Sequence, residues 1–151
     1  MTVSQDYVGR SVDLCVLETP AYPGPGPVAV GVTSSGTAVS GPYKVVQKFT
    51  KFLLTELGSV PGDPEYGTTF AVKLLNGHIN TIIGLELELY ADLPDAINYV
   101  AGTVLAPVDS ESLSNVLVDG ISSSQDGVTV RLKFIFKDSS VILAPVAIST
   151  V

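Results

Sequence analysis

Two carboxylates lie close together at Asp63 and Glu65, within the stretch LLTELGSVPGDPEYGTTF at 53–70. Glycoside hydrolysis needs such a pair, and two residues apart in a turn they reach separations of roughly 5–9 Å. However, any Asp-X-Glu sequence meets this spacing, and the chain has no Trp and few aromatic residues for holding sugar rings. An acidic residue just before a helix also stabilises the helix dipole. Catalysis by this pair is therefore the minor interpretation.

The single histidine, His78, and the single cysteine, Cys15, offer no further catalytic pattern. His78 follows Gly77 at a predicted helix end, where a histidine commonly faces the last carbonyls, so we expect neither a triad nor a zinc site. Cys15 has no partner for an internal disulfide, which favours a buried side chain and synthesis in a reducing compartment. The GPGP run at 24–27 lacks the Lys-Ser/Thr of a phosphate loop. We expect no cofactor.

The 53–70 stretch joins two predicted helices. Apolar residues recur at spacings of three and four over about 42–57, which predicts the first helix. Ser40 can cap this helix, and Pro42 suits its first turn. Gly58 lies just past its predicted end, where a left-handed residue is often needed.

A second, shorter helix is predicted to begin after Thr68 or Thr69 and to stop at Gly77. Residues 80–93 alternate like a strand but also fit a helix face. We favour a helix there, because Leu and Glu are better helix formers than strand formers. A further helix is predicted over 92–107, with Asp92 as its possible cap and a proline in its first turn.

The rest of the chain favours strands. Residues 11–18 alternate as one strand, 19–27 contain four prolines and form a linker or arm, and 28–41 open as a short strand. Near the C-terminus, 113–124 is rich in β-branched and small residues, and QDG at 125–127 indicates a hairpin. Residues 128–136 and 141–148 complete a three-stranded antiparallel meander, in which Pro145 places the last strand at a sheet edge. The order predicts an α+β fold with two to four helices.

The composition indicates a surface partly covered by another chain. Apolar residues make up 46% and charged residues only 15%, against about 25% charged in an average soluble domain. The net charge is −7 and the basic residues form no run, which disfavours nucleic acid and an anionic membrane surface as partners. No apolar run reaches the ~18 residues of a membrane span, and the N-terminus lacks the pattern of a signal peptide.

The stretch 53–70 resembles the baseplate wedge and sheath-initiator proteins of contractile phage tails, a family sometimes labelled lysozyme-like. Those proteins share a helix that ends in a Leu-Leu-Thr-type run, a Gly, a spacer, and Pro-Glu-Phe/Tyr-Gly before the next helix. The resemblance covers about 45–76, extends more weakly over 113–148, and is absent over 1–40. The corresponding residues at this joint are Leu54, Thr55, Gly58, Pro64, Glu65, Tyr66, Gly67 and Thr68.

Many members carry a Glu-Pro-Arg motif that binds the helical bundle of the wedge. The corresponding region here is NYVAGTVLAPVDSES, which has Pro107 without that string. The contact with the bundle is therefore not carried over. The residue patterns give 1–41 as an N-terminal strand and arm, and the resemblance implies 42–151 as the family-like α+β domain.

The resemblance implies a structural protein of the virion, made in the host cytoplasm, without enzyme activity. Such a protein sits in the tail baseplate near the tube, in several copies, and offers strands that continue into the tail sheath protein. Tube or wedge proteins are its other implied partners. An exposed strand edge fits this role, because its unpaired N–H and C=O groups accept another strand. The residues expected on the partner strands are Val128, Val130, Leu132, Phe134, Phe136, Val141, Leu143 and Val146.

Two alternatives remain open. The first is a small glycan-cleaving tail lysozyme that uses Glu65 and Asp63. The second is another tail subunit, such as a tube or terminator protein, built on a similar sheet.

Overall fold

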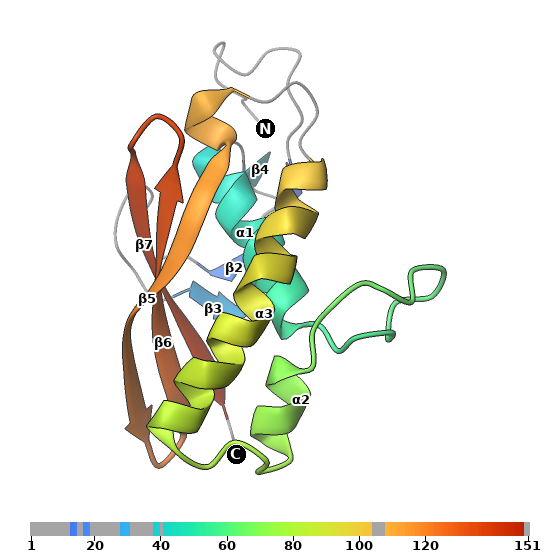
Figure 1. The fold of residues 1–151 in the computed structure, drawn as a ribbon, viewed down its shortest axis with the longest axis vertical. Coiled ribbons are helices and arrows are strands. Elements are labelled where there is room, and N and C mark those ends of the chain that lie inside the picture. The colour runs from blue at the N-terminus through green and yellow to red at the C-terminus, as the bar shows by residue number, and fades with distance from the viewer. Residues whose placement is uncertain are drawn as a thin grey trace.

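The computed structural model describes residues 41–103 and 108–149, and before residue 41 it describes only the backbone of four short strands. Helices α1 and α3 cover one face of a sheet, which confirms the predicted α+β fold (Figure 1). The elements before residue 104 are β1 (Asp13–Leu14), β2 (Leu17–Glu18), β3 (Val28–Val30), β4 (Ala38–Val39), α1 (Pro42–Leu54), α2 (Phe70–Leu75) and α3 (Ile82–Thr103). The later elements are η2 (Asp109–Glu111), β5 (Leu113–Ser124), β6 (Gly127–Phe136) and β7 (Val141–Ser149).

The main sheet has the strand order β2-β3-β7-β6-β5. Strands β5, β6 and β7 form the predicted antiparallel meander, with tight turns between them. Strand β3 adds to β7 in parallel, with Val28 opposite Val146. The prediction that β7 is the edge strand is therefore wrong for its second half. Pro145 is compatible with this pairing because β3 pairs with β7 only from Val146 onward. The absence of an N–H on Pro145 therefore removes no hydrogen bond to β3.

Two further expectations for the N-terminal region differ from the structure. The single strand predicted over 11–18 is replaced by β1 and β2, which belong to different sheets: β1 pairs with β4, and β2 pairs with β3. The short strand expected from residue 28 is confirmed as β3. The Pro-rich arm at 19–27, Cys15 and Ser40 lie outside the described residues.

Helix α1 begins at Pro42 as predicted, but it ends at Leu54 rather than at 57. The cause is Thr55, which is extended and donates its N–H to the carbonyls of Lys51 and Phe52. Helix α2 follows Thr69 and ends before Gly77, which adopts a positive φ of 74°. These bounds confirm the second predicted helix.

Residues 82–103 form one helix, α3, so the prediction of a separate helix capped by Asp92 is wrong. Pro94 lies inside α3, and its side chain is exposed. The buried row continues on both sides of Pro94 at helical spacing. Packing therefore maintains the helix, although Pro94 cannot donate a backbone hydrogen bond. That row is Leu85, Leu89, Leu93, Ala96 and Val100.

The core lies between the two long helices and the inner face of the sheet. Phe49 of α1 contacts Phe134 of β6 edge-on, with ring centroids 5.1 Å apart, and both are fully buried. Alternate residues of β6 point into this core, as period-two patterning requires. The buried residues of β6 are Val130, Leu132, Phe134 and Phe136.

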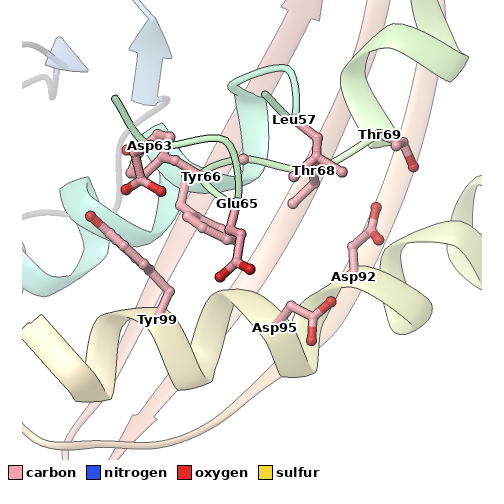
Figure 2. Close-up of a pocket in the computed structure, with 11 residues that line it drawn as sticks. Leu57, Asp63, Glu65, Tyr66, Thr68, Thr69, Asp92, Asp95 and Tyr99 are labelled. Atoms are coloured by element: carbon pink, nitrogen blue, oxygen red, sulfur yellow. The ribbon is translucent and has the colours of Figure 1, made fainter. Parts of the chain in front are cut away.

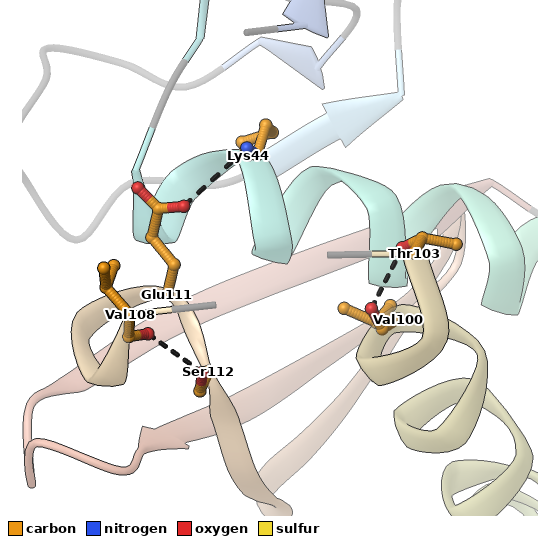
Figure 3. A network of polar contacts seen from close by, with 6 residues as sticks. All are labelled: Lys44, Val100, Thr103, Val108, Glu111 and Ser112. Carbon is orange, nitrogen blue, oxygen red and sulfur yellow. Dashed lines mark hydrogen bonds and ion pairs between the residues drawn. The ribbon is translucent and has the colours of Figure 1, made fainter. Parts of the chain in front are cut away.

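Polar contacts hold the first turn of α1, η2 and the start of β5 in place (Figure 3). Lys44 Nζ lies 3.8 Å from Glu111 Oε2, and both side chains are nearly inaccessible to water. This ion pair joins the first turn of α1 to η2. The Ser112 hydroxyl donates to the Val108 carbonyl at 2.9 Å, which fixes the start of β5.

Phe49→Ala should lower the free energy of unfolding by about 3–5 kcal/mol, because it empties a fully packed aromatic site. Leu143→Ala is the matched control, since Leu143 is 41% exposed on the opposite face of the sheet and should cost less than about 1 kcal/mol. Urea unfolding of both variants measures the difference. Equal losses would contradict this placement of the core.

Candidate functional site

The segment between α1 and α2 leaves the body of the molecule and returns to it (Figure 1). Three hydrogen bonds close its base. The Thr68 hydroxyl donates to the Leu53 carbonyl at 2.6 Å, and the Thr68 N–H donates to the Thr55 carbonyl at 2.9 Å. The Leu57 N–H donates to the Thr68 carbonyl at 3.0 Å. Thr68, predicted as a helix cap, therefore ties the two ends of the loop together.

Gly67 allows the two backbone segments of this loop to approach each other closely. Its φ is 105°, and a Cβ at this position would lie 2.5 Å from the Thr55 carbonyl oxygen and 2.9 Å from the Glu56 carbonyl. Gly58 and Gly62 also have positive φ, but a Cβ at Gly62 would meet nothing within 4 Å. Gly67 is thus required for space as well as for conformation.

Tyr66 anchors the loop to both long helices. Its ring meets Phe52 of α1 and Tyr99 of α3 edge-on, with centroids 5.2 and 5.1 Å apart. Phe52 and Tyr99 stack on each other at 4.5 Å. Aromatic contacts of this kind contribute about 0.5–1.5 kcal/mol each beyond the area that they bury. The cluster therefore sets the position of the loop relative to α3.

A hollow of about 470 Å³ lies beside this cluster, between the loop and α3 (Figure 2). Asp63 and Glu65 reach it from the loop, and Asp92 and Asp95 reach it from α3. None of the residues that line it is basic. The predicted carboxylate pair is thus brought together with two further carboxylates, and the hollow carries concentrated negative charge.

Asp92 is the carboxylate of this set with a perturbed titration. Burial raises the pKa of Asp92, the positive charge of Lys73 lowers it, and the carboxylates of Glu88 and Asp95 raise it. Its Oδ2 is buried and accepts no hydrogen bond from the described residues. Lys73 itself is 2.8 Å from Glu88, which raises the pKa of Lys73.

Tyr99 is a hydroxyl donor at the same hollow. Burial raises the pKa of Tyr99, and the negative charge of Asp63 raises it further. The phenol therefore stays protonated at neutral pH. Carboxylates beside a hydroxyl donor suit a basic side chain of a partner, and they also resemble the polar groups that contact a sugar.

The described residues contain no group of three or more His, Cys, Asp or Glu side chains that can hold a metal ion. His78 is exposed just after α2, and its backbone N–H donates to the Lys73 carbonyl. Across the described ranges, no helix is both long and apolar enough to cross a bilayer.

No match to this chain emerges among protein-family models, curated proteins or solved structures.

The residues expected on the partner strands divide into two groups. Val128 is half-buried, and four residues of β6 with Val146 of β7 are buried against the helices. Val141 and Leu143 are 47% and 41% exposed on the other face of the sheet. Among the described residues, the two expected positions on the outer face of β7 are therefore exposed, whereas the row of β6 is buried against the helices.

Asp92 and Asp95 were not predicted as site residues, although a signal exists. With Tyr99 they recur at spacings of three and four, which places them on one side of a helix. All three lie within the helix predicted over 92–107, but Asp92 was interpreted there as a cap. Their meeting with Asp63 and Glu65 depends on a long-range contact that spacing alone does not predict.

Gly67→Ala should destabilise the fold far more than Gly62→Ala. Both substitutions place an L-residue at positive φ, which costs about 1–2 kcal/mol, but only the first adds a clash with the backbone of Thr55 and Glu56. We expect an additional loss of roughly 2 kcal/mol or more, measured by chemical denaturation. Similar losses in both variants would show that the backbones do not approach closely here.

Asp92→Asn should stabilise the protein at neutral pH and leave it unchanged near pH 3. Because the folded pKa of Asp92 is raised, the folded state holds this proton more tightly, and stability falls as pH rises from the ordinary pKa of Asp through the raised one. The Asp92→Asn variant avoids this loss of stability, because the Asn side chain does not ionise. The measurement is urea unfolding across this pH range.

Lys73→Met is the companion variant, because it removes the charge that lowers the pKa of Asp92. It should steepen the fall in stability with rising pH. Identical pH profiles for wild type and Asp92→Asn would contradict the buried environment of Asp92.

Proposed function

We propose that this protein is a structural subunit of a contractile phage tail, located in the baseplate, which anchors or initiates the tail sheath by accepting a β-strand near the tube. The resemblance of 53–70 to baseplate wedge and sheath-initiator proteins supports the proposal. The structural observation that carries it is the backbone edge of β7 at 141–144, with which no described strand pairs on the side away from β6. The proposal assigns no catalytic step to the protein.

The first half of β7 offers this edge. Pro145 lies opposite Arg131 of β6, and because it has no N–H, it fits this ladder with its nitrogen directed away from β6. Val141 and Leu143 precede Pro145 by four and two residues, so they occupy equivalent positions along the strand. Their N–H and C=O groups therefore also point away from β6. Strand β3 pairs with β7 at Val146 and beyond. Within the described residues, no strand pairs with 141–144 on that side.

The other long edge of the sheet is less suited to strand addition. Strand β5 is outermost, but its pairing with β6 is interrupted by register shifts at Leu113/Asn115 and at Val118/Gly120. Bulges of this kind twist an edge and discourage further pairing. An exposed apolar pair, Val141 and Leu143, adds side-chain contacts beside the edge of β7. We therefore assign the incoming strand of the sheath protein to β7.

The closed loop between α1 and α2 supports an assembly role because it is held firmly. The bonds of Thr68, the close approach at Gly67 and the ring of Tyr66 fix its place against α3. A rigid, acidic projection suits a contact with a basic surface of a tube or wedge protein. Several copies around the tube would each present one such projection.

Leu143→Pro should reduce sheath nucleation by roughly tenfold, equivalent to about 1.4 kcal/mol. The substitution removes the outward N–H that a partner strand needs and leaves the β6 ladder intact. Leu143→Ala is the matched control, since it shortens the side chain but keeps the N–H, and it should nucleate sheaths. The measurement counts sheathed tubes by electron microscopy when the protein is mixed with its sheath and tube proteins.

The Leu143→Pro variant must retain the melting temperature of wild type within a few degrees. If it does not, Val141→Pro is used in its place. Sheaths that nucleate normally from a folded Leu143→Pro variant would refute strand addition at β7.

A glycan-cleaving tail lysozyme is the second candidate function. The observation in its favour is that Asp63 and Glu65 line the same hollow as Asp92, whose pKa burial raises, as a general acid requires. Against it, Asp63 and Glu65 are exposed, and the chain has no Trp. Release of soluble fragments from peptidoglycan that disappears in a folded Glu65→Gln variant would establish this alternative.

A further inference from the structure

Helix α3 carries a second apolar row that the core does not use. Ile83, Leu87 and Tyr90 are 74%, 66% and 44% exposed. Their spacings of four and three place them one above the other on one side of the helix, and the exposed Pro94 continues the row. The buried row of α3 occupies a different side. The helix therefore presents one apolar side to the core and another to solvent.

A separate hollow lies at the start of the helix, on the side of Ile82 rather than of the exposed row. Ile82 and Leu75 are 51% and 59% exposed and line a hollow of about 380 Å³ together with the buried Leu74 and Ile79. Single exposed apolar residues are ordinary, but a contiguous set such as Ile83, Leu87 and Tyr90 marks a contact surface. A large apolar side chain of a partner can fill this hollow.

Charge disfavours a second copy of the chain as the occupant. Helix α3 carries Glu86, Glu88, Asp92 and Asp95 and has no Lys or Arg. Glu86 and Asp95 are exposed beside the apolar row. Packing α3 against its own copy would bring like charges together in a protein of net charge −7, which is unfavourable. A partner with Lys or Arg beside its own apolar row complements the same surface.

Pro94 adds a hydrogen-bond acceptor to this side of the helix. Because a proline has no N–H, the carbonyl of Tyr90, four residues earlier, lacks its normal intrahelical donor. That carbonyl lies next to the apolar row. A Lys or Arg side chain of a partner can donate to it, which again favours a basic partner.

We propose that Ile83, Leu87 and Tyr90 form a docking surface for an amphipathic helix of another protein, whose apolar row is flanked by Lys or Arg. The eight residues 83–90 of α3 give a straight ridge roughly 10 Å long, and a helix packs such a ridge into the groove between its own side chains. The proposal is independent of the sheath-anchoring function, because it uses α3 and not the edge of β7.

The test uses the full chain and a fluorescein-labelled synthetic helix of about five turns, with Leu at the inward heptad positions and Lys at the flanking ones. A second peptide replaces every Lys by Glu. Fluorescence anisotropy should show saturable binding of the Lys peptide. The Glu peptide should bind at least tenfold more weakly.

Leu87→Gln should weaken binding of the Lys peptide at least tenfold. Leu117→Gln is the matched control, because Leu117 is similarly apolar and 36% exposed but lies on β5; it should bind as wild type does. Circular dichroism checks that each variant is folded, and Ile83→Gln gives the same test if Leu87→Gln is not.

Three results would overturn the proposal: no saturable binding of the Lys peptide, equal binding of both peptides, or unchanged binding by a folded Leu87→Gln variant. Sedimentation of the free protein gives a fourth. A wild-type dimer that Leu87→Gln converts to monomer would show that a second copy covers the row.

Discussion

The close approach of two backbone segments at Gly67 is the constraint on which the arrangement of the helices depends. A side chain at this position would meet the Thr55 carbonyl at 2.5 Å, so the loop closes only around a glycine. Once it closes, Thr68 bonds to the last turn of α1 through both its hydroxyl and its N–H. Tyr66 is then placed between Phe52 and Tyr99, and the loop is held against α3.

This joint separates the surface into regions with different chemistry. On one side of α3, the loop and the helix enclose a hollow lined by four carboxylates. On another side, the same helix exposes Ile83, Leu87 and Tyr90. At the first half of β7, the sheet adds a backbone edge with which no other described strand pairs. Each region suits contact with another chain, which agrees with a composition that has few charged residues and many apolar ones.

Local patterns predicted much of the fold. The period of three and four in α1, and the alternation of β6 between buried and exposed positions, follow from the packing of one face of each element. The end of α1 was misplaced because Thr55 adopts an extended conformation that allows the loop to close, and no local signal marks this. Helix α3 was divided because Asp92 and Pro94 suit the cap and the first turn of a new helix, whereas here the buried row continues past both of them.

The site was predicted only in part, for the same physical reason. Asp63 and Glu65 stand out by their spacing, but Asp92 and Asp95 join them through the contact between the loop and α3, which spans about thirty residues of sequence. The parallel pairing of β3 with β7 is similarly long-range. Such pairings depend on the whole fold, so neither periodicity nor turn chemistry reports them.

A cryo-EM map of the intact tail, or of the protein assembled with its sheath and tube proteins, tests strand addition at β7 most directly. The account predicts that the chain lies at the junction of tube and sheath, with a strand of a sheath subunit hydrogen-bonded along 141–144. An edge of β7 that faces solvent in the assembled tail, with the sheath attached elsewhere, would contradict it.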